Sequence, residues 1–163
     1  MPIHDLHTID YIEARDLAAA VRDEVSSDGG LPVATAVLDA FGGILIIERP
    51  NSSVKAMSAD NAIRKAKTVL EFLRATAKFR FKQNVNGEWL PAGGDGWSEL
   101  DIAIALARDS NFCPWAGGIP LIREIEGGRC LLGALAVSNR DELEDHDLVA
   151  RAAHSRGYII DGF

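Results

Sequence analysis

The chain has 163 residues, of which 47% are hydrophobic and 25% are charged, and this composition predicts one globular domain, residues 1–163, with a continuous core. A formal net charge of -7 excludes the basic surface that binding to nucleic acid or to an anionic membrane requires. The N-terminus has neither the basic nor the apolar part of a secretory signal, and no apolar run reaches membrane-spanning length, so we expect a cytoplasmic protein.

The first elements are a helix and a hairpin. Thr8 is a good N-cap for a helix whose apolar side begins with Ile9. Two apolar runs, 33–38 and 44–48, then flank the glycine-containing turn 39–43, and they predict an antiparallel hairpin. Because both runs are continuously apolar, we expect helices or a second subunit to cover both faces of this hairpin.

Residues 58–74 show the clearest helical period of the sequence, since apolar side chains recur every three or four positions. The opposite side of this helix carries four basic residues: Arg64, Lys65, Lys67 and Arg74. In an acidic chain, such a group indicates either a solvated helix face, which is the simpler interpretation, or a ligand-binding face.

Residues 75–97 are irregular and rich in glycine, with two tryptophans among basic side chains. A segment of this length in a compact domain is usually functional, and we interpret it as a lid or a subunit contact. The net charge disfavours the alternative of a site for single-stranded nucleic acid.

The last third of the chain predicts a short helix, a second hairpin and a final helix. A capping sequence at Ser98 opens the short helix, which runs to about Arg108. Four of its apolar residues are expected to face inward: Leu100, Ala103, Ile104 and Ala107. Residues 119–125 and 130–137 form the hairpin, and 141–154 the helix. This order of elements favours an α+β fold, with an antiparallel sheet of four to five strands flanked by helices.

Three stretches resemble the family named for the glycolate-operon protein GlcG and the haem-binding protein HbpS (DUF336). They are 36–43 (AVLDAFGG), 64–68 (RKAKT) and 117–146, which begins with GGIPL and contains Glu-Asp-His near the start of the last helix. The resemblance extends from residue 8 to about 155 and implies a profilin-like α/β sandwich that forms dimers or larger assemblies. Members are linked to haem binding, to cobalamin-related processing and to operons for small oxygenated or aromatic carbon sources.

Haem requires an axial ligand in an apolar cavity, and a histidine is one of the usual choices. Among the four histidines, His146 is the best candidate, because it follows Asp145, which matches an acidic position of the family. His146 and His154 are about 80° apart around a helix axis, so they do not form a facing metal pair. No other histidine spacing resembles a zinc motif, and we predict no metal site.

A small carboxylate would need a cation to hold it and a group for proton transfer. Arg49 is the preferred anchor, since members of the family commonly have an arginine after the second strand, and Asp145 or His146 would be the acid or base. The ligand-binding residues that the resemblance indicates are Arg64, Lys65, Lys67, Thr68, Trp115, Gly117, Gly118, Ile119 and Pro120. Trp115 suits either the apolar wall of a pocket or a subunit interface.

Three functions remain open. The leading one is a homo-oligomeric protein that binds a small ligand, either a tetrapyrrole such as haem or an oxygenated or aromatic carboxylate. The pocket would lie between the turn 117–120, the helix segment 64–68 and the start of the last helix. The alternatives are a cofactor-independent lyase or isomerase of a small organic acid, and a structural subunit of an assembly.

Overall fold

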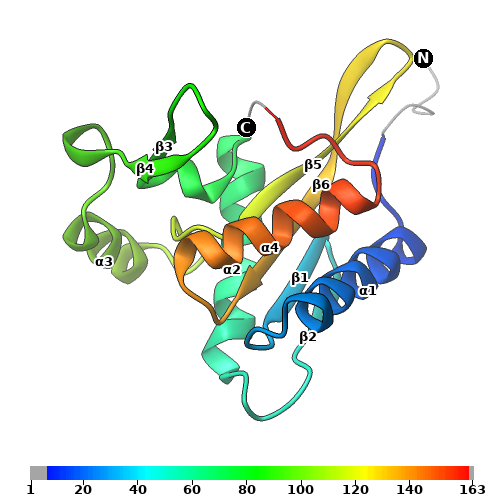
Figure 1. Cartoon of the computed structure of the whole chain (residues 1–163), viewed down its shortest axis with the longest axis horizontal. Helices are drawn as coiled ribbons and strands as arrows, with labels where there is room; N and C mark the ends of the chain where they lie inside the picture. The colour runs from blue at the N-terminus through cyan, green and yellow to red at the C-terminus, as the bar shows by residue number, and fades with distance from the viewer. Residues whose placement is uncertain (1–6, 162–163) are drawn as a thin grey trace.

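The computed structural model describes residues 7–161 and confirms the α+β fold, with a four-stranded antiparallel sheet flanked by helices (Figure 1). Strands β1 (Ala34–Asp39) and β2 (Ile44–Glu48) form the first predicted hairpin. Strands β5 (Gly118–Ile125) and β6 (Gly128–Ser138) form the second. Since β1 pairs with β6, the strand order is β2-β1-β6-β5, and the two hairpins join in the middle of the sheet.

Three helices cover the two faces of this sheet. Helix α2 (Ala56–Phe72) lies on one face, while α1 (Tyr11–Asp28) and α4 (Glu142–Ser155) lie side by side on the other (Figure 1). Successive residues of a strand point to opposite faces. The residues of β1 and β6 that pack toward α2 are mostly small: Ala34, Ala36, Leu38, Ala134 and Ala136. Their size allows α2 to pack close to the sheet.

The first helix begins two residues later than the sequence predicts. Asp10, not Thr8, is the N-cap, because Asp10 and Glu13 form a reciprocal capping box. The Thr8 hydroxyl instead accepts a hydrogen bond from the Ala40 amide at 3.0 Å and donates to the Leu132 carbonyl at 3.3 Å. Thr8 therefore joins the chain start to the sheet.

The expectation that both faces of the first hairpin are covered holds for β1 only. All but the last residue of β1 are buried. Strand β2 lies at the edge of the sheet, and its Ile44 and Ile47 are exposed. Leu45 and Ile46 pack against the core, so residues 7–161 cover only part of the apolar run of β2.

The segment predicted to be irregular contains short elements. It includes the 3₁₀ turns η1 (Thr76–Phe79) and η2 (Gly93–Asp95) and a small hairpin of β3 (Phe81–Gln83) and β4 (Trp89–Pro91). Three-residue strands carry too little alternation to be recognised in a sequence.

Helix α3 (Glu99–Arg108) has the predicted boundaries and the predicted capping box at Ser98. Its predicted inward face is wrong, however, because Ile102 is the only buried residue of the helix, and Leu100 is 69% exposed. The apolar residues of α3 are spread around most of its circumference, so their spacing did not define one face.

Candidate functional site

The start of α4 places two adjacent candidate residues in two different cavities. Asp145 lines a cavity of about 450 Å³, and His146 lines another of about 340 Å³. Neighbouring residues of a helix point about 100° apart, so side chains at successive positions do not meet. The two acid–base candidates of the sequence therefore do not share one site.

The first cavity, here called the ion-pair cavity, is built around a salt bridge between α2 and α4. The Lys65 ammonium nitrogen lies 3.1 Å from Asp145 Oδ2 and also donates to the Val137 carbonyl at 3.0 Å. Lys65 is only 2% exposed and Asp145 only 1%. Asp145 Oδ1 accepts a further hydrogen bond from the Arg140 amide at 3.1 Å. Burial raises the pKa of Asp145, and the charge of Lys65 opposes this effect.

Gly117, just before β5, leaves the space that this ion pair needs, and Gly118, the first residue of β5, leaves space for the backbone of α2. A Cβ atom at Gly117, whose φ is +123°, would lie 2.7 Å from the Val137 carbonyl oxygen and 2.9 Å from the Lys65 ammonium nitrogen. A Cβ atom at Gly118 would lie 3.1 Å from the Lys65 carbonyl oxygen. These predicted ligand-binding residues therefore act on packing, because they let α2 approach β5 and β6.

A second ion pair borders the same cavity. Arg80, which follows η1, pairs with Glu142 at the start of α4 and lies 3.7 Å from Glu99 of α3. Glu142 Oε2 also accepts a hydrogen bond from the Ala116 amide at 3.3 Å, next to Trp115, which lines the cavity. The sequence analysis missed Arg80 and Glu142, since no local pattern joins residues so far apart in the chain.

The second cavity, here called the histidine cavity, has walls of both apolar and polar residues, which come from β5, α4, the small β3–β4 hairpin and the end of the described chain. His146 is 7% exposed, and its ring packs edge-on against Trp89 with a centroid separation of 4.7 Å. Ile119 and Pro120 of β5 line the same space. His146 Nδ1 is buried and has no hydrogen-bond partner among residues 7–161. Burial and, to a smaller extent, Lys78 lower the pKa of His146 to about 4, so the imidazole is neutral at neutral pH.

Four other candidates line neither cavity: Arg49, Arg64, Lys67 and Thr68. Exposed Arg49 follows the edge strand β2, and its Nε donates to the Val54 carbonyl at 2.6 Å. Arg64 donates to the carbonyl of Asp109 at 3.1 Å and so holds the end of α3. Lys67 donates to the side-chain oxygen of Asn111 at 3.0 Å. The basic residues of α2 thus have separate roles, and only Lys65 reaches a cavity wall.

Thr68 is a structural residue by its contacts. Its hydroxyl accepts a hydrogen bond from the Cys113 amide and donates to the Arg64 carbonyl, both at 2.8 Å. Both bonds are buried or partly buried, and they fasten the segment before β5 to α2.

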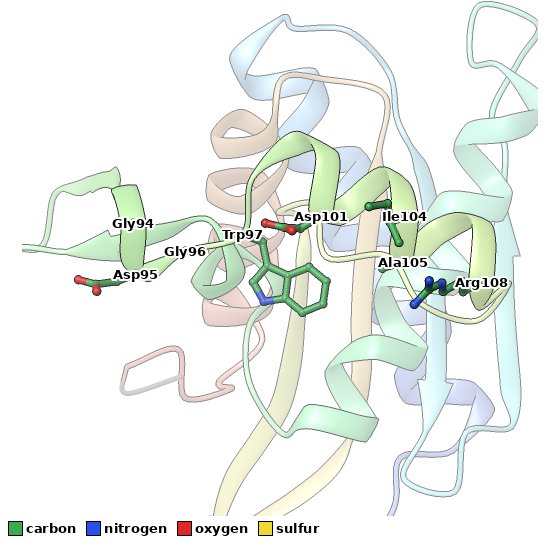
Figure 2. A pocket seen from close by; sticks show the side chains of 8 residues that line it. All are labelled: Gly94, Asp95, Gly96, Trp97, Asp101, Ile104, Ala105 and Arg108. Carbon is green, nitrogen blue, oxygen red and sulfur yellow. The ribbon is translucent and has the colours of Figure 1, made fainter.

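A further hollow, of about 580 Å³, lies beside α3 (Figure 2). Trp97, Ile104 and Arg108 line it, whereas Asp95 points away from them (Figure 2). Asp101 of this hollow is already used in the capping box of α3. Residues 94–97 of its lining belong to the segment interpreted as a lid or subunit contact, but no candidate catalytic or ligand-binding residue lines it, and none of its titratable side chains is buried. The ion-pair cavity and the histidine cavity, in contrast, contain such candidates.

The structure excludes two further types of feature for residues 7–161. No three side chains of the His, Cys, Asp and Glu types come together as a metal-binding cluster. No helix of this part of the chain combines the length and the apolar character that crossing a bilayer requires.

The sequence and the fold identify the family. Residues 9–154 match the family model described as haem degrading protein HbpS-like, so the chain belongs to the HbpS-like family. This result confirms the resemblance seen in the motifs. The sequence has no significant match among curated proteins.

Solved structures of relatives share the fold. Protein ORFY of Klebsiella pneumoniae, a DUF336 protein, is 22% identical, with a TM-score of 0.70 over 94% of both chains. PduOC in complex with haem is 16% identical, with a TM-score of 0.69 over 93% of this chain and 97% of that one. A double mutant of Streptomyces reticuli HbpS is 20% identical, with a TM-score of 0.68 over 96% of this chain and 92% of that one. These likenesses establish the fold.

Replacing Lys65 by Met should lower the free energy of unfolding by about 3–5 kcal/mol, because the Asp145 carboxylate would stay buried without its partner. Urea unfolding measures the change. The double replacement Lys65→Met and Asp145→Leu should recover most of the loss, since it removes both charges. Lys67→Met, on the exposed side of the same helix, is the control and should cost less than about 1 kcal/mol. Equal losses for the two lysines would contradict the role of the buried pair.

Stability should decrease as the pH falls from 6.5 to about 4. The unfolded chain takes up a proton at His146 near pH 6.5, whereas the folded chain resists it down to about pH 4. The predicted loss of stability is about 3 kcal/mol; it is complete once the pH lies below both pKa values, and His146 adds no further pH dependence there. Urea unfolding at a series of pH values should show this slope in the wild type and in His154→Leu, an exposed position of the same helix. The slope should be smaller in His146→Leu, and an unchanged slope in that variant would refute a buried neutral imidazole.

Proposed function

We propose that this protein binds haem in the histidine cavity, with His146 as the axial ligand of the iron. The observation that carries the proposal is the buried, neutral imidazole whose Nδ1 has no partner among the described residues. A buried polar atom without a hydrogen bond is costly, and a ligand bond to iron would satisfy it. Imidazole is a common axial ligand of haem iron.

The walls of the cavity suit the remainder of such a ligand. Trp89, Ile119, Pro120 and Ile160 offer apolar surface around the imidazole. Ligand sites of this type combine apolar walls with a few polar groups that fix the orientation. The description of the family and the solved complex of PduOC with haem support the choice of ligand. When bound, haem would supply iron-centred redox chemistry at this place.

The contacts do not favour the lyase or isomerase considered from the sequence. That reaction would require Arg49 as the substrate anchor, close to Asp145 or His146 as the acid or base. Arg49 lines neither cavity, and the two acid–base residues face different ones. Neither cavity therefore contains Arg49 together with an acid–base candidate, and we do not propose this reaction.

Haemin titration of the purified chain tests the proposal. We expect a saturable shift of the Soret band at a haemin concentration equal to that of the protein, because one histidine cavity is present in each chain. His146→Ala should weaken binding at least about tenfold, since the iron–imidazole bond is lost. The control His154→Ala should bind as the wild type does. If the wild type gives no saturable shift, or if His146→Ala binds equally well, the assignment is wrong.

We also propose that the protein is a homo-oligomer that pairs through β2. This edge strand has unpaired backbone groups and the exposed apolar residues Ile44 and Ile47, a combination that favours pairing with a second strand. Native mass spectrometry should show a dimer or larger assembly. Ile47→Lys should shift it toward the monomer, and the control Leu31→Lys, at an exposed position before β1, should not. A monomeric wild type would contradict this proposal.

A further inference from the structure

We propose that the ion-pair cavity is a second binding site, which accepts a small carboxylate and works independently of haem. Its volume of about 450 Å³ lies within the range of small-molecule sites. The cavity shares no lining residue with the histidine cavity. A ligand in one cavity would therefore leave the walls of the other in place.

The first argument is the remaining hydrogen-bonding capacity of Lys65. An ammonium group has three N–H donors, and the contacts within residues 7–161 use two of them, to Asp145 and to the Val137 carbonyl. Lys65 lines the cavity, so the third donor is available to a ligand there. The group is 2% exposed, and a charged donor in such surroundings binds an anionic oxygen more strongly than it would in water.

The second argument is the set of donors on the first turns of α2. Lys55, Ser58 and Asn61 line the same side of the cavity as Lys65. Lys55 makes no salt bridge with the rest of the described chain. The N-terminus of α2, which has no side-chain cap, adds partial positive charge at this end. One side of the cavity thus presents donors of hydrogen bonds and positive charge.

The third argument is that three of the four acidic side chains in the lining already lie beside a cation. Asp145 pairs with Lys65, and Glu142 and Glu99 pair with Arg80. Asp141 has no salt bridge among residues 7–161, but it is exposed, where water and salt screen its charge. An entering carboxylate would therefore meet little repulsion.

The organic part of the ligand has a place as well. Half-buried Trp115 and exposed Met57 line the cavity and offer apolar surface. A carboxylate on Lys65 with its carbon skeleton toward Trp115 would use both the charged and the apolar parts of the wall. This arrangement fits a small organic acid, because one carboxylate on Lys65 and one apolar skeleton beside Trp115 use both parts of the wall.

Isothermal titration calorimetry of the full chain with acetate, lactate and benzoate, and with acetamide, lactamide and benzamide, tests the inference. We expect at least one acid to bind, and its uncharged amide to bind at least about tenfold more weakly, since the amide lacks the charge that Lys65 recognises. If no acid binds, or if acids and amides bind equally, the inference is overturned.

Variants then locate the site. Lys55→Glu should weaken binding of the acid about tenfold, whereas Lys67→Glu, the same charge change on the same helix outside the cavity, should change it less than about twofold. The folded double variant Lys65→Met and Asp145→Leu should abolish binding. Binding that survives this double variant would refute the site.

His146→Ala separates the two proposals. It should keep carboxylate binding while it loses the haemin signal, because His146 does not line the ion-pair cavity. If His146→Ala loses both, the independence of the two sites is refuted, whereas a loss of haemin binding alone leaves both proposals standing.

Discussion

The buried ion pair between Lys65 and Asp145 is the constraint on which the rest of the structure depends. It joins α2, on one face of the sheet, to α4, on the other. The pair lies at the end of β6, where the Val137 carbonyl accepts a further hydrogen bond from Lys65. Two charges removed from water are tolerated only with close and well-satisfied geometry. This requirement explains the glycine at 117, because any larger residue would collide with the pair. It also sets the rotation of α4 about its own axis.

The rotation of α4 determines what the adjacent residue can do. With Asp145 held against Lys65, His146 points toward β5 and the β3–β4 hairpin, where Trp89 and Ile119 surround it. One helix start therefore separates a cavity built around a buried ion pair from one built around a neutral imidazole. The two ligand classes that the sequence left open, a tetrapyrrole and a small carboxylate, correspond to these two environments, so they need not be alternatives.

The sequence predicts the main elements well, because long apolar runs and helical periods dominate them. The antiparallel hairpins and the last helix follow from such patterns. Lys65 could not be distinguished from Lys67, since both are basic residues on one helix, and only the distant Asp145 makes them different. His146 was found through its family position, but its burial depends on Trp89, in a segment without periodicity. Arg49 lines neither cavity, and the sequence could not show this, because it does not place β2 and β5 at opposite edges of the sheet.

The most direct test is a crystal structure of the haemin-loaded protein, with the iron located by its anomalous scattering. Our account predicts one iron position per chain, within bonding distance of a nitrogen of His146 and beside Trp89, with the contact between Lys65 and Asp145 intact. An iron position in the ion-pair cavity, or at a contact between subunits away from His146, would contradict it.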